Sequence, residues 1–349
     1  MAALNEEIKA TAEDYNDYEV QTIFFGGGTP SCIAENKIKD CLLTVQKHFH
    51  VADNAEITLE LNPKTASFEK LKYLKAVGIN RLSIGLQSTD NRELKLLGRI
   101  HTFEDFLITY DWARTANFQN INVDLMSALP GQSFATWQNT LQTVLKLKPE
   151  HISAYSLIIE EGTKLFDHIS QYPPVPDEDT DRLMYHETKR LLAAHGYMRY
   201  EISNYAKKGF ESRHNQIYWQ RGCDHIRDYI GFGLGASSTV GSHRYKNTEN
   251  LSEYMADCKT PDRLRRDKEL LSRQDLMEEF LFLGLRRMEG ISISEFERTF
   301  GTSLDSIYQD TLKKWEDADC LIEKNGFWSL TEQGIDISNV ILSDFLQEI

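Results

Sequence analysis

The segment Gly26-Gly27-Gly28-Thr29-Pro30 has the clearest capacity for chemistry in this chain. It follows the apolar run Ile23-Phe24-Phe25, which is typical of a buried strand that ends at this point. Glycine permits backbone conformations with positive φ and lets a ligand approach the main chain closely. In proteins built from repeating strand–helix units, ligands bind at this edge of the sheet. The segment therefore predicts a ligand-binding loop.

Polar side chains lie at the ends of the next apolar runs. Glu60 and Asn62 come at the end of the second run, Gln87 ends the third, and Asp124 lies inside the fourth. A carboxylate inside an apolar strand is costly unless it is paired or hydrogen-bonded, so Asp124 either caps a loop from within the core or binds a ligand. Arg99, beyond the third run, is suited to a carboxylate. Together these groups predict a site for a small polar ligand.

A regular alternation of strands and helices must position these residues. Amphipathic segments separate β-branched apolar runs, with a repeat of about 30 to 35 residues that suits a TIM-like barrel. Only five strands are predicted, whereas a closed barrel has eight, so we expect an α/β fold with a partial, open barrel. The predicted strands cover residues 20–25, 57–61, 81–86, 121–125 and 151–159, and the predicted helices cover 35–49, 68–77, 103–116 and 134–147.

The pattern changes after a proline-rich break at Tyr172-Pro173-Pro174-Val175-Pro176. A long helix over 178–195 and a strand-like segment over 197–205 follow. Residues 213–246 are rich in aromatic residues, His and Gly, and this composition predicts a functional segment that folds back on the barrel. Helices over 277–287, from 294 and over 312–318 precede a hairpin of 321–323 with 327–330, which is typical of a winged-helix-like module. We expect a barrel domain over 1–172, an extension over 173–272 and a C-terminal α+β domain over 273–349.

The overall charge argues against several classes of partner. The net charge is −14, and from Gln274 onward 16 acidic residues face 6 basic ones, so we expect neither nucleic acid nor an anionic membrane as a partner. The winged-helix-like module is therefore expected to be a small packing domain. The sequence has no signal peptide and no apolar run long enough to insert into a membrane, so we expect a cytoplasmic protein.

The cysteines show no pattern of a metal site or a disulfide framework. No two of the five are separated by two or three residues, so none form a local thiolate clip for zinc or an iron–sulfur cluster. Each is most simply a free thiol that packs as a small hydrophobic side chain. They are Cys32, Cys41, Cys223, Cys258 and Cys320.

An ordered set of segments resembles the radical SAM family, in the branch that contains oxygen-independent coproporphyrinogen III oxidase and the heme chaperone HemW. The resemblance extends over nearly the whole chain, including the acidic C-terminal domain. A lone GGGTP would be weak, but the order and spacing of the set are specific. The matching segments are GGGTP at 26–30, ELNP at 60–63, GINRLSIGLQS at 78–88, LGRIH at 97–101, NVDLM at 122–126 and LPGQ at 129–132.

The resemblance implies a site for S-adenosyl-L-methionine (SAM). Gly26, Gly27, Gly28 and Thr29 would meet the amino group of its methionine part, Glu60 would line the same pocket, and Arg99 would pair with the carboxylate. Gln87 and Asp124 would hold the ribose hydroxyls. Gly233, within the glycine-rich segment 231–235, would lie near the adenine, although a tight turn explains this segment equally well.

One departure from the family pattern is severe. The family carries CxxxCxxC in a loop after its first strand, and those thiolates ligate a [4Fe–4S] cluster whose fourth iron binds SAM. Here residues 5–18 match the helix after that loop, so the first strand and all three ligands are absent from the sequence. Cys32 and Cys41 follow the GGGTP loop and cannot replace them. We expect no reductive cleavage of SAM by these residues, with truncation favoured over a natural cluster-less form.

The segment His214-Asn215-Gln216-Ile217-Tyr218-Trp219 resembles the HNxxYW motif of the heme chaperone group. It implies a heme site in which imidazole ligates iron and aromatic faces stack on the macrocycle. Arg213 could pair with a propionate. The alternative is a hydrogen-bonded packing cluster around the histidine. Residues 220–228 depart from the pattern of the group.

Three functions remain open at this stage. The first is a cytoplasmic heme chaperone that carries SAM and a cluster in its intact form and delivers heme to membrane respiratory enzymes. The second is an oxygen-independent coproporphyrinogen III oxidase, against which the HNxxYW segment and the lack of an oxidase-type N-terminal extension argue. The third is a cluster-less scaffold protein, which a CxxxCxxC encoded upstream of Met1 would exclude. A chain that lacks the first strand exposes one edge of its sheet, and a second copy of the chain could cover this edge in a homodimer.

Overall fold

The computed structural model describes residues 1–220 and 228–346, which form parts of two compact units. Unit 1 comprises residues 1–21, 37–55 and 213–349, and unit 2 comprises residues 22–36 and 56–212. The GGGTP loop belongs to unit 2, and the HNxxYW segment belongs to unit 1. Cys223 lies outside the described residues. The domain boundaries expected from the sequence stay a prediction.

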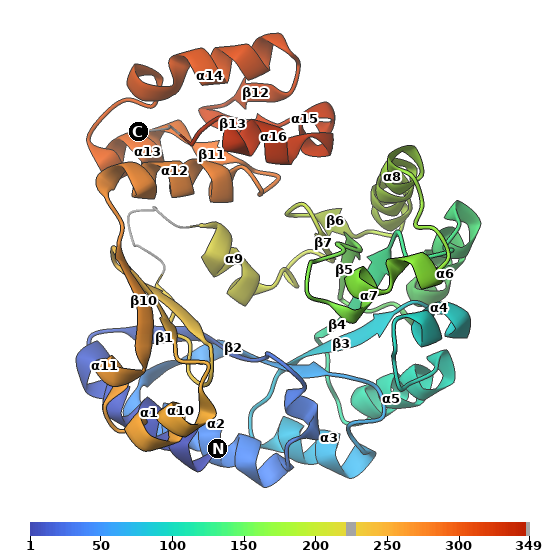
Figure 1. The fold of residues 1–349 in the computed structure, drawn as a ribbon, viewed down its shortest axis with the longest axis vertical. Helices are drawn as coiled ribbons and strands as arrows, with labels where there is room; N and C mark the ends of the chain where they lie inside the picture. Colours follow the sequence, from blue (N-terminus) through green and yellow to red (C-terminus); the bar gives the residue numbers. More distant parts are fainter. Residues whose placement is uncertain (221–227, 347–349) are drawn as a thin grey trace. The chain divides into compact units, whose positions relative to one another are not determined.

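The main sheet has seven strands in the order β1-β2-β3-β4-β5-β7-β6. Strands β2 to β5 pair in parallel, whereas the short strands β6 and β7 pair antiparallel to their neighbours. The sheet is curled and open, which confirms the partial barrel (Figure 1). The strands are β1 (Glu19–Phe25), β2 (His50–Leu61), β3 (Arg81–Gln87), β4 (Ile121–Ser127), β5 (His151–Ser156), β6 (Met198–Arg199) and β7 (Asn204–Ala206).

The helices of unit 2 start where the sequence supplies a capping side chain. Ser67, Asp90, Thr102, Ser133 and Asp177 each accept a hydrogen bond from a first-turn amide, as N-caps do. Short loops therefore return the chain to the next strand in a fixed register. These helices are α3 (Phe68–Ala76), α4 (Asn91–Leu96), α5 (Phe103–Thr115), α6 (Phe134–Leu147), α7 (Lys164–Asp167) and α8 (Glu178–Ala194).

The interior of unit 2 lies between these helices and the sheet. All seven residues of β3 are buried, as expected for a central strand covered on both faces. Trp137 on α6 is 1 % exposed, and its indole N–H donates to Thr188 on α8 over 2.9 Å. This hydrogen bond satisfies the polar atom of a large buried ring and fixes the two helices together.

Unit 1 contains a three-stranded antiparallel sheet, β10-β9-β8, that the sequence pattern did not predict. Its strands are β8 (Ser237–Val240), β9 (His243–Asn247) and β10 (Arg265–Leu270). The helices of this part are α1 (Ala2–Ala12), α2 (Glu35–His48), α9 (Arg213–Trp219), α10 (Leu251–Asp257) and α11 (Pro261–Leu264).

The C-terminal part of unit 1 has the predicted helices and hairpin. Strand β13 pairs with both β12 and β11, and an aromatic core packs among the helices, with Phe296 and Phe300 at 4.8 Å between ring centroids. The winged-helix-like α+β part of the predicted fold is thereby confirmed. The elements are α12 (Arg273–Gly284), β11 (Ile291–Ser292), α13 (Ile293–Phe300), α14 (Asp305–Asp317), β12 (Leu321–Lys324), β13 (Phe327–Leu330), α15 (Glu332–Asp336) and α16 (Ser338–Ser343).

In the described part of the chain, every helix is too short or too polar to cross a membrane.

Candidate functional site

The glycine loop after β1 presents bare backbone. Gly27 and Gly28 have φ of 72° and 65°, and a Cβ atom on either would meet nothing within 4 Å. A Cβ on Gly26 would lie 2.5 Å from the ring of Phe24 and 3.2 Å from the carboxyl carbon of Glu60. Glycine is therefore required at Gly26 by close packing and at the next two positions by backbone conformation.

Hydrogen bonds from neighbouring loops hold the chain that follows the glycines. The Nζ of Lys70 on α3 donates to the carbonyls of Ser31 and Ile33, each over 2.6 Å. The backbone N–H of Asn62 donates to Ser31 Oγ over 3.3 Å, and its Nδ2 donates to Thr29 Oγ1 over 3.3 Å. The loop after β1 is thereby fixed to the loop after β2.

Arg99 joins the same group of residues from the segment after α4. Its Nη1 donates to Asn62 Oδ1 over 3.3 Å, so Asn62 lies between Thr29 and Arg99. The guanidinium retains further N–H donors for a ligand, because Arg carries five in all. A carboxylate placed here would meet a donor that is already held in position.

Gln87 adopts an unusual backbone conformation at the end of β3. Its φ is 73°, and the pairing of β3 with β4 shifts register between Gly85 and Gln87. A bulge of this kind re-aims a side chain at the end of a strand. The Tyr155 hydroxyl on β5 donates to Gln87 Oε1 over 3.1 Å, which leaves the amide N–H groups of Gln87 available as donors.

Two carboxylates complete the group. Asp124 accepts from Ser83 Oγ over 3.0 Å and from Asn122 Nδ2 over 2.6 Å, and burial nevertheless raises its pKa. Burial also raises the pKa of Glu60, the charge of Asp124 adds to this, and the N–H of Gly27 opposes it. Both groups favour a ligand that brings positive charge or hydrogen-bond donors.

Tyr155 lies within the electric field of the charged members of this group. The pKa of Tyr155 is raised to about 12, chiefly by burial; the charges of Asp124 and Glu60 contribute to the rise, and the charge of Arg99 opposes it. We call this set the strand-end cluster. It comprises Glu60, Asn62, Gln87, Arg99, Asp124 and Tyr155, all in unit 2.

The structure thus brings together most of the predicted SAM residues. The strand-end cluster and the glycine loop offer acceptors for an ammonium group, donors for a carboxylate, and acceptors and donors for hydroxyl groups. These residues fit SAM. The side chains of Phe24 and Glu60 lie so close to Gly26 that no side chain fits at that position, so the loop presents bare backbone beside Glu60. Sequence reasoning missed Tyr155, although its place in the second half of the predicted strand over 151–159 was a usable signal.

Gly233 lies in unit 1, so its predicted place near the adenine stays a prediction. Its N–H donates to Glu7 Oε2 on α1 over 3.0 Å, and its carbonyl accepts from Asn247 Nδ2 over 3.0 Å. Glu7 is 2 % exposed and also accepts from Asn247 Nδ2 over 2.6 Å and from the Tyr254 hydroxyl over 2.5 Å. The glycine-rich segment is therefore fixed by a buried carboxylate.

The predicted heme residues lie on or beside α9, and all are half-buried. The Nε2 of His214 is 2.9 Å from the Tyr218 hydroxyl, one turn further along the helix. The guanidinium of Arg286 lies 4.6 Å from the ring centre of Trp219, whose Nε1 is buried and has no hydrogen-bond partner among the residues that the structure describes. Arg213 donates to the carbonyl of Asn54 over 2.7 Å and to Gln21 Oε1 over 2.8 Å, so its guanidinium is already held in position within unit 1.

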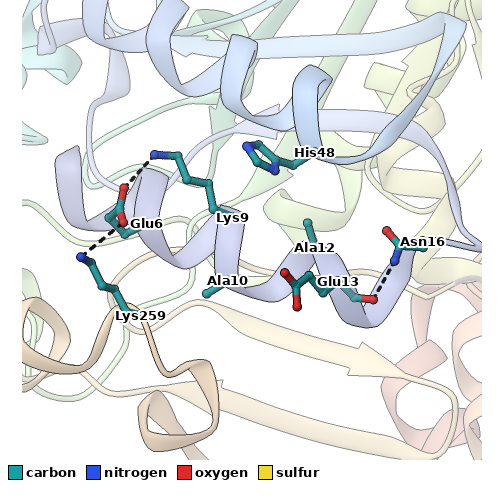
Figure 2. A pocket seen from close by; sticks show the side chains of 8 residues that line it. All are labelled: Glu6, Lys9, Ala10, Ala12, Glu13, Asn16, His48 and Lys259. Carbon is teal, nitrogen blue, oxygen red and sulfur yellow. Dashed lines mark hydrogen bonds and ion pairs between the residues drawn. The ribbon is translucent and has the colours of Figure 1, made fainter.

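A pocket of about 390 Å³ lies elsewhere on unit 1 (Figure 2). In this pocket Glu6 forms ion pairs with Lys9 and Lys259, and the side-chain amide of Asn16 donates to the backbone carbonyl of Glu13. None of the predicted site residues lines it. Among the described residues, no three His, Cys, Asp or Glu side chains form a group that could hold a metal ion, so these residues do not fit an iron–sulfur cluster.

Comparisons with known proteins identify the family of the chain. Residues 3–144 match the model of the radical SAM superfamily, and residues 271–337 match that of the HemN C-terminal domain. The chain is 34% identical to the heme chaperone HemW of Bacillus subtilis, over 99% of this chain and 91% of that protein. It is 32% identical to the heme chaperone HemW of Lactococcus lactis, over 97% and 89%.

A solved structure shows the same fold. Coproporphyrinogen III oxidase (HemN) from Escherichia coli, described as a radical SAM enzyme, superposes with a TM-score of 0.85 at 21% identity, covering 99% of this chain and 82% of that one. The likeness extends to the C-terminal part as well as the open barrel. On these sequence and fold relationships, the chain belongs to the radical SAM superfamily, in the HemW and HemN branch.

Proposed function

We propose that this protein is a cytoplasmic heme chaperone that binds SAM at the strand-end cluster and binds and transfers heme through α9. The single observation that carries the proposal is the sequence identity of 34% and 32%, over nearly the whole chain, to two proteins named heme chaperone HemW. The HNxxYW sequence on α9 supports the heme site, and the convergence of loop backbone and polar side chains in unit 2 supports the SAM site.

Each part of SAM has a proposed partner in unit 2. The glycine loop and Glu60 accept the ammonium group, and Arg99 donates to the carboxylate. Gln87 and Asp124 hold the ribose hydroxyls. Asp124 is a hydrogen-bond acceptor, and Ser83 and Asn122, which donate to its carboxylate, fix its orientation. Binding a cation beside two buried carboxylates relieves their mutual repulsion, which gives the site a reason to prefer a positively charged ligand.

Heme is proposed to contact α9. A histidine imidazole can serve as an axial ligand of heme iron, and the half-buried rings of Tyr218 and Trp219 offer flat apolar surface to the macrocycle. Arg213 remains a candidate partner for a propionate. Membrane respiratory enzymes are the proposed recipients of the heme.

In the family, a [4Fe–4S] cluster supplies the electron that cleaves SAM reductively. We derive no step through it here, because the described residues do not supply its ligands. Anaerobic reconstitution of the 349-residue chain with iron and sulfide checks this point. We expect sub-stoichiometric iron, and a stoichiometric four-iron cluster would contradict the expectation.

A second candidate function is that of coproporphyrinogen III oxidase. The match of residues 271–337 to the HemN C-terminal domain favours it. The two functions differ in their product: an oxidase converts coproporphyrinogen III, whereas a chaperone binds heme and releases it unchanged. Anaerobic incubation with coproporphyrinogen III, followed by porphyrin chromatography, distinguishes them.

The experiment that tests the proposed function is an optical titration with heme, using the wild type and His214→Ala. We expect a saturable shift of the Soret band that weakens in the variant. His243→Ala, at an exposed position of β9 in the same unit, is the matched control and should titrate like the wild type. The absence of a shift in the wild type would contradict heme binding by this chain.

A further inference from the structure

A continuous chain of hydrogen bonds begins at Asp124 and runs away from the strand-end cluster through the interior of unit 2. Its first link is Asn122, two residues earlier on β4. The Nδ2 of Asn122 donates to Asp124 Oδ1 over 2.6 Å and to Ser83 Oγ over 2.8 Å. Ser83 in turn donates to Asp124 Oδ2 over 3.0 Å. Both oxygens of the carboxylate are therefore held by one small network.

The orientation of the Asn122 amide fixes the next link. A carboxylate only accepts hydrogen bonds, so the Nδ2 group of Asn122 must face Asp124 and its Oδ1 must face the other way. That oxygen is 2.6 Å from His151 Nδ1 and accepts from Ser153 Oγ over 3.2 Å. Because the amide oxygen has no proton to give, His151 carries its proton on Nδ1.

The other ring nitrogen of His151 is held as an acceptor. The Tyr200 hydroxyl lies 2.8 Å from Nε2 and donates to it, while the Tyr200 oxygen accepts from the Ser212 N–H over 3.3 Å. Every donor in the chain thus points the same way, from Ser212 toward Asp124. Reversing any member would place two acceptors or two donors together.

The surroundings keep His151 neutral. Its side chain is 0 % exposed, and burial together with the charge of Arg81 holds its pKa well below the usual value. Arg81 is 2 % exposed and also acts on Asp124, whose pKa its charge lowers. A protonated His151 would put a second cation beside the buried Arg81 and would remove the acceptor that Tyr200 needs.

We propose that His151 is a positioning residue of the site: it locks the Asn122 amide in the one orientation that presents both Asp124 oxygens at fixed angles. This inference rests on the proposed function, in which Asp124 receives the ribose hydroxyls of SAM. Without the His151 donor, Asn122 Oδ1 keeps the longer bond from Ser153 Oγ, at 3.2 Å. The amide is then held less firmly, and the angles at which the Asp124 oxygens meet a ligand are no longer fixed.

Two variants of the full chain test the role. His151→Leu removes the donor to Asn122, whereas Tyr200→Phe keeps that donor and removes the bond that sets the tautomer, together with the acceptor of the Ser212 N–H. We expect each to weaken SAM binding about tenfold, measured by calorimetry, while heme titration stays unchanged. His151→Gln, whose amide can donate to Asn122, should recover most of the affinity. Trp137→Phe is the control, since it also loses a buried hydrogen bond of unit 2 but lies outside this chain.

Long-range ¹H–¹⁵N NMR of histidine-labelled protein adds a readout that needs no SAM. We expect the Nδ1–H tautomer of His151 in the wild type and a mixture of tautomers in Tyr200→Phe. Two outcomes would overturn the positioning role. The first is an Nε2–H tautomer of His151 in the wild type. The second is that His151→Leu and Tyr200→Phe both bind SAM as the wild type does, while Asp124→Ala loses SAM binding. If the wild type binds no SAM, or Asp124→Ala binds it normally, the proposed site fails and this role fails with it. The wild-type tautomer then shows whether the chain of hydrogen bonds was itself correct.

Discussion

The carboxylate of Asp124 on β4 raises the pKa of Glu60 on β2, so these two acids lie within each other's field inside unit 2. Burial raises the pKa of both. For both acids the main cause of the raised pKa is burial, and the group that opposes it most is neither a lysine nor an arginine. The backbone N–H of Gly27 offsets only part of the rise in the pKa of Glu60. Two such groups destabilise the ligand-free fold, and a cationic ligand would reverse that effect.

We therefore expect Glu60→Gln to stabilise the ligand-free protein at neutral pH and to weaken SAM binding. The pKa of Glu60 is raised in the folded state, so its unfavourable contribution is absent below the unfolded value of 4.5 and appears as pH rises through the folded value. The gain in unfolding free energy should accordingly be larger at pH 7.5 than at pH 5. Urea unfolding at both pH values measures it.

Glu104→Gln is a suitable control because Glu104 is exposed and lies outside the strand-end cluster. Its pKa is lowered, chiefly by the hydrogen bond from Asn91, so its substitution should give the opposite sign. Equal destabilisation by Glu60→Gln at both pH values would show that Glu60 serves packing instead of the ligand.

Arg99→Ala and Asp124→Ala should each weaken SAM binding by roughly tenfold or more, since each removes hydrogen bonds to or from a charged group. Heme titration should be unaffected, because α9 belongs to unit 1 and both substitutions lie in unit 2. Arg92→Ala is the matched control: Arg92 is exposed on α4 and pairs with Asp90. Calorimetry with SAM and optical titration with heme measure the two affinities in one preparation. Equal loss of both ligands would mean that the pocket is misassigned.

Much of the fold was predictable because its elements have strong local signals. The apolar runs that became β3 and β4 are covered on both faces, and helices such as α6 begin at a capping serine, Ser133. The sheet β8 to β10 was missed for a physical reason. All but one residue of β10 is exposed, and its sequence, Arg265–Leu270, has neither an apolar run nor strict alternation.

The candidate site was predictable where side chains follow strand ends, as with Glu60 and Asp124. It was not predictable where it depends on pairing between distant segments. Nothing in the sequence near Gln87 indicates its positive φ, which comes with the register shift between β3 and β4. Nor does the sequence show that Tyr200, 49 residues after His151, would set the tautomer of that histidine.

Glu7 supports a further prediction in unit 1. Its carboxylate accepts from Gly233, Asn247 and Tyr254, and burial raises its pKa. Glu7→Gln replaces one acceptor oxygen by a donor, which leaves a buried donor unpaired at a cost of about 1–3 kcal/mol. We expect a lower melting temperature and faster hydrogen exchange at residues 231–235. Glu6→Gln, at the neighbouring surface position, should change neither. Unaltered exchange in Glu7→Gln would show that the glycine-rich segment is held by other contacts.

The last prediction concerns the hydrogen bond between His214 Nε2 and the Tyr218 hydroxyl, 2.9 Å long. If iron is ligated through this nitrogen, Tyr218 competes with heme for it. Tyr218→Phe keeps the ring but releases the nitrogen, so we expect heme to bind up to about tenfold more tightly, in line with the loss of one hydrogen bond. Tyr229→Phe is the control, because the Tyr229 ring contacts Tyr218 at 4.8 Å while its hydroxyl accepts from Thr239 instead. Weaker binding in Tyr218→Phe, with the control unchanged, would instead make the Tyr218 hydroxyl a direct contact of heme and would assign iron ligation to another group.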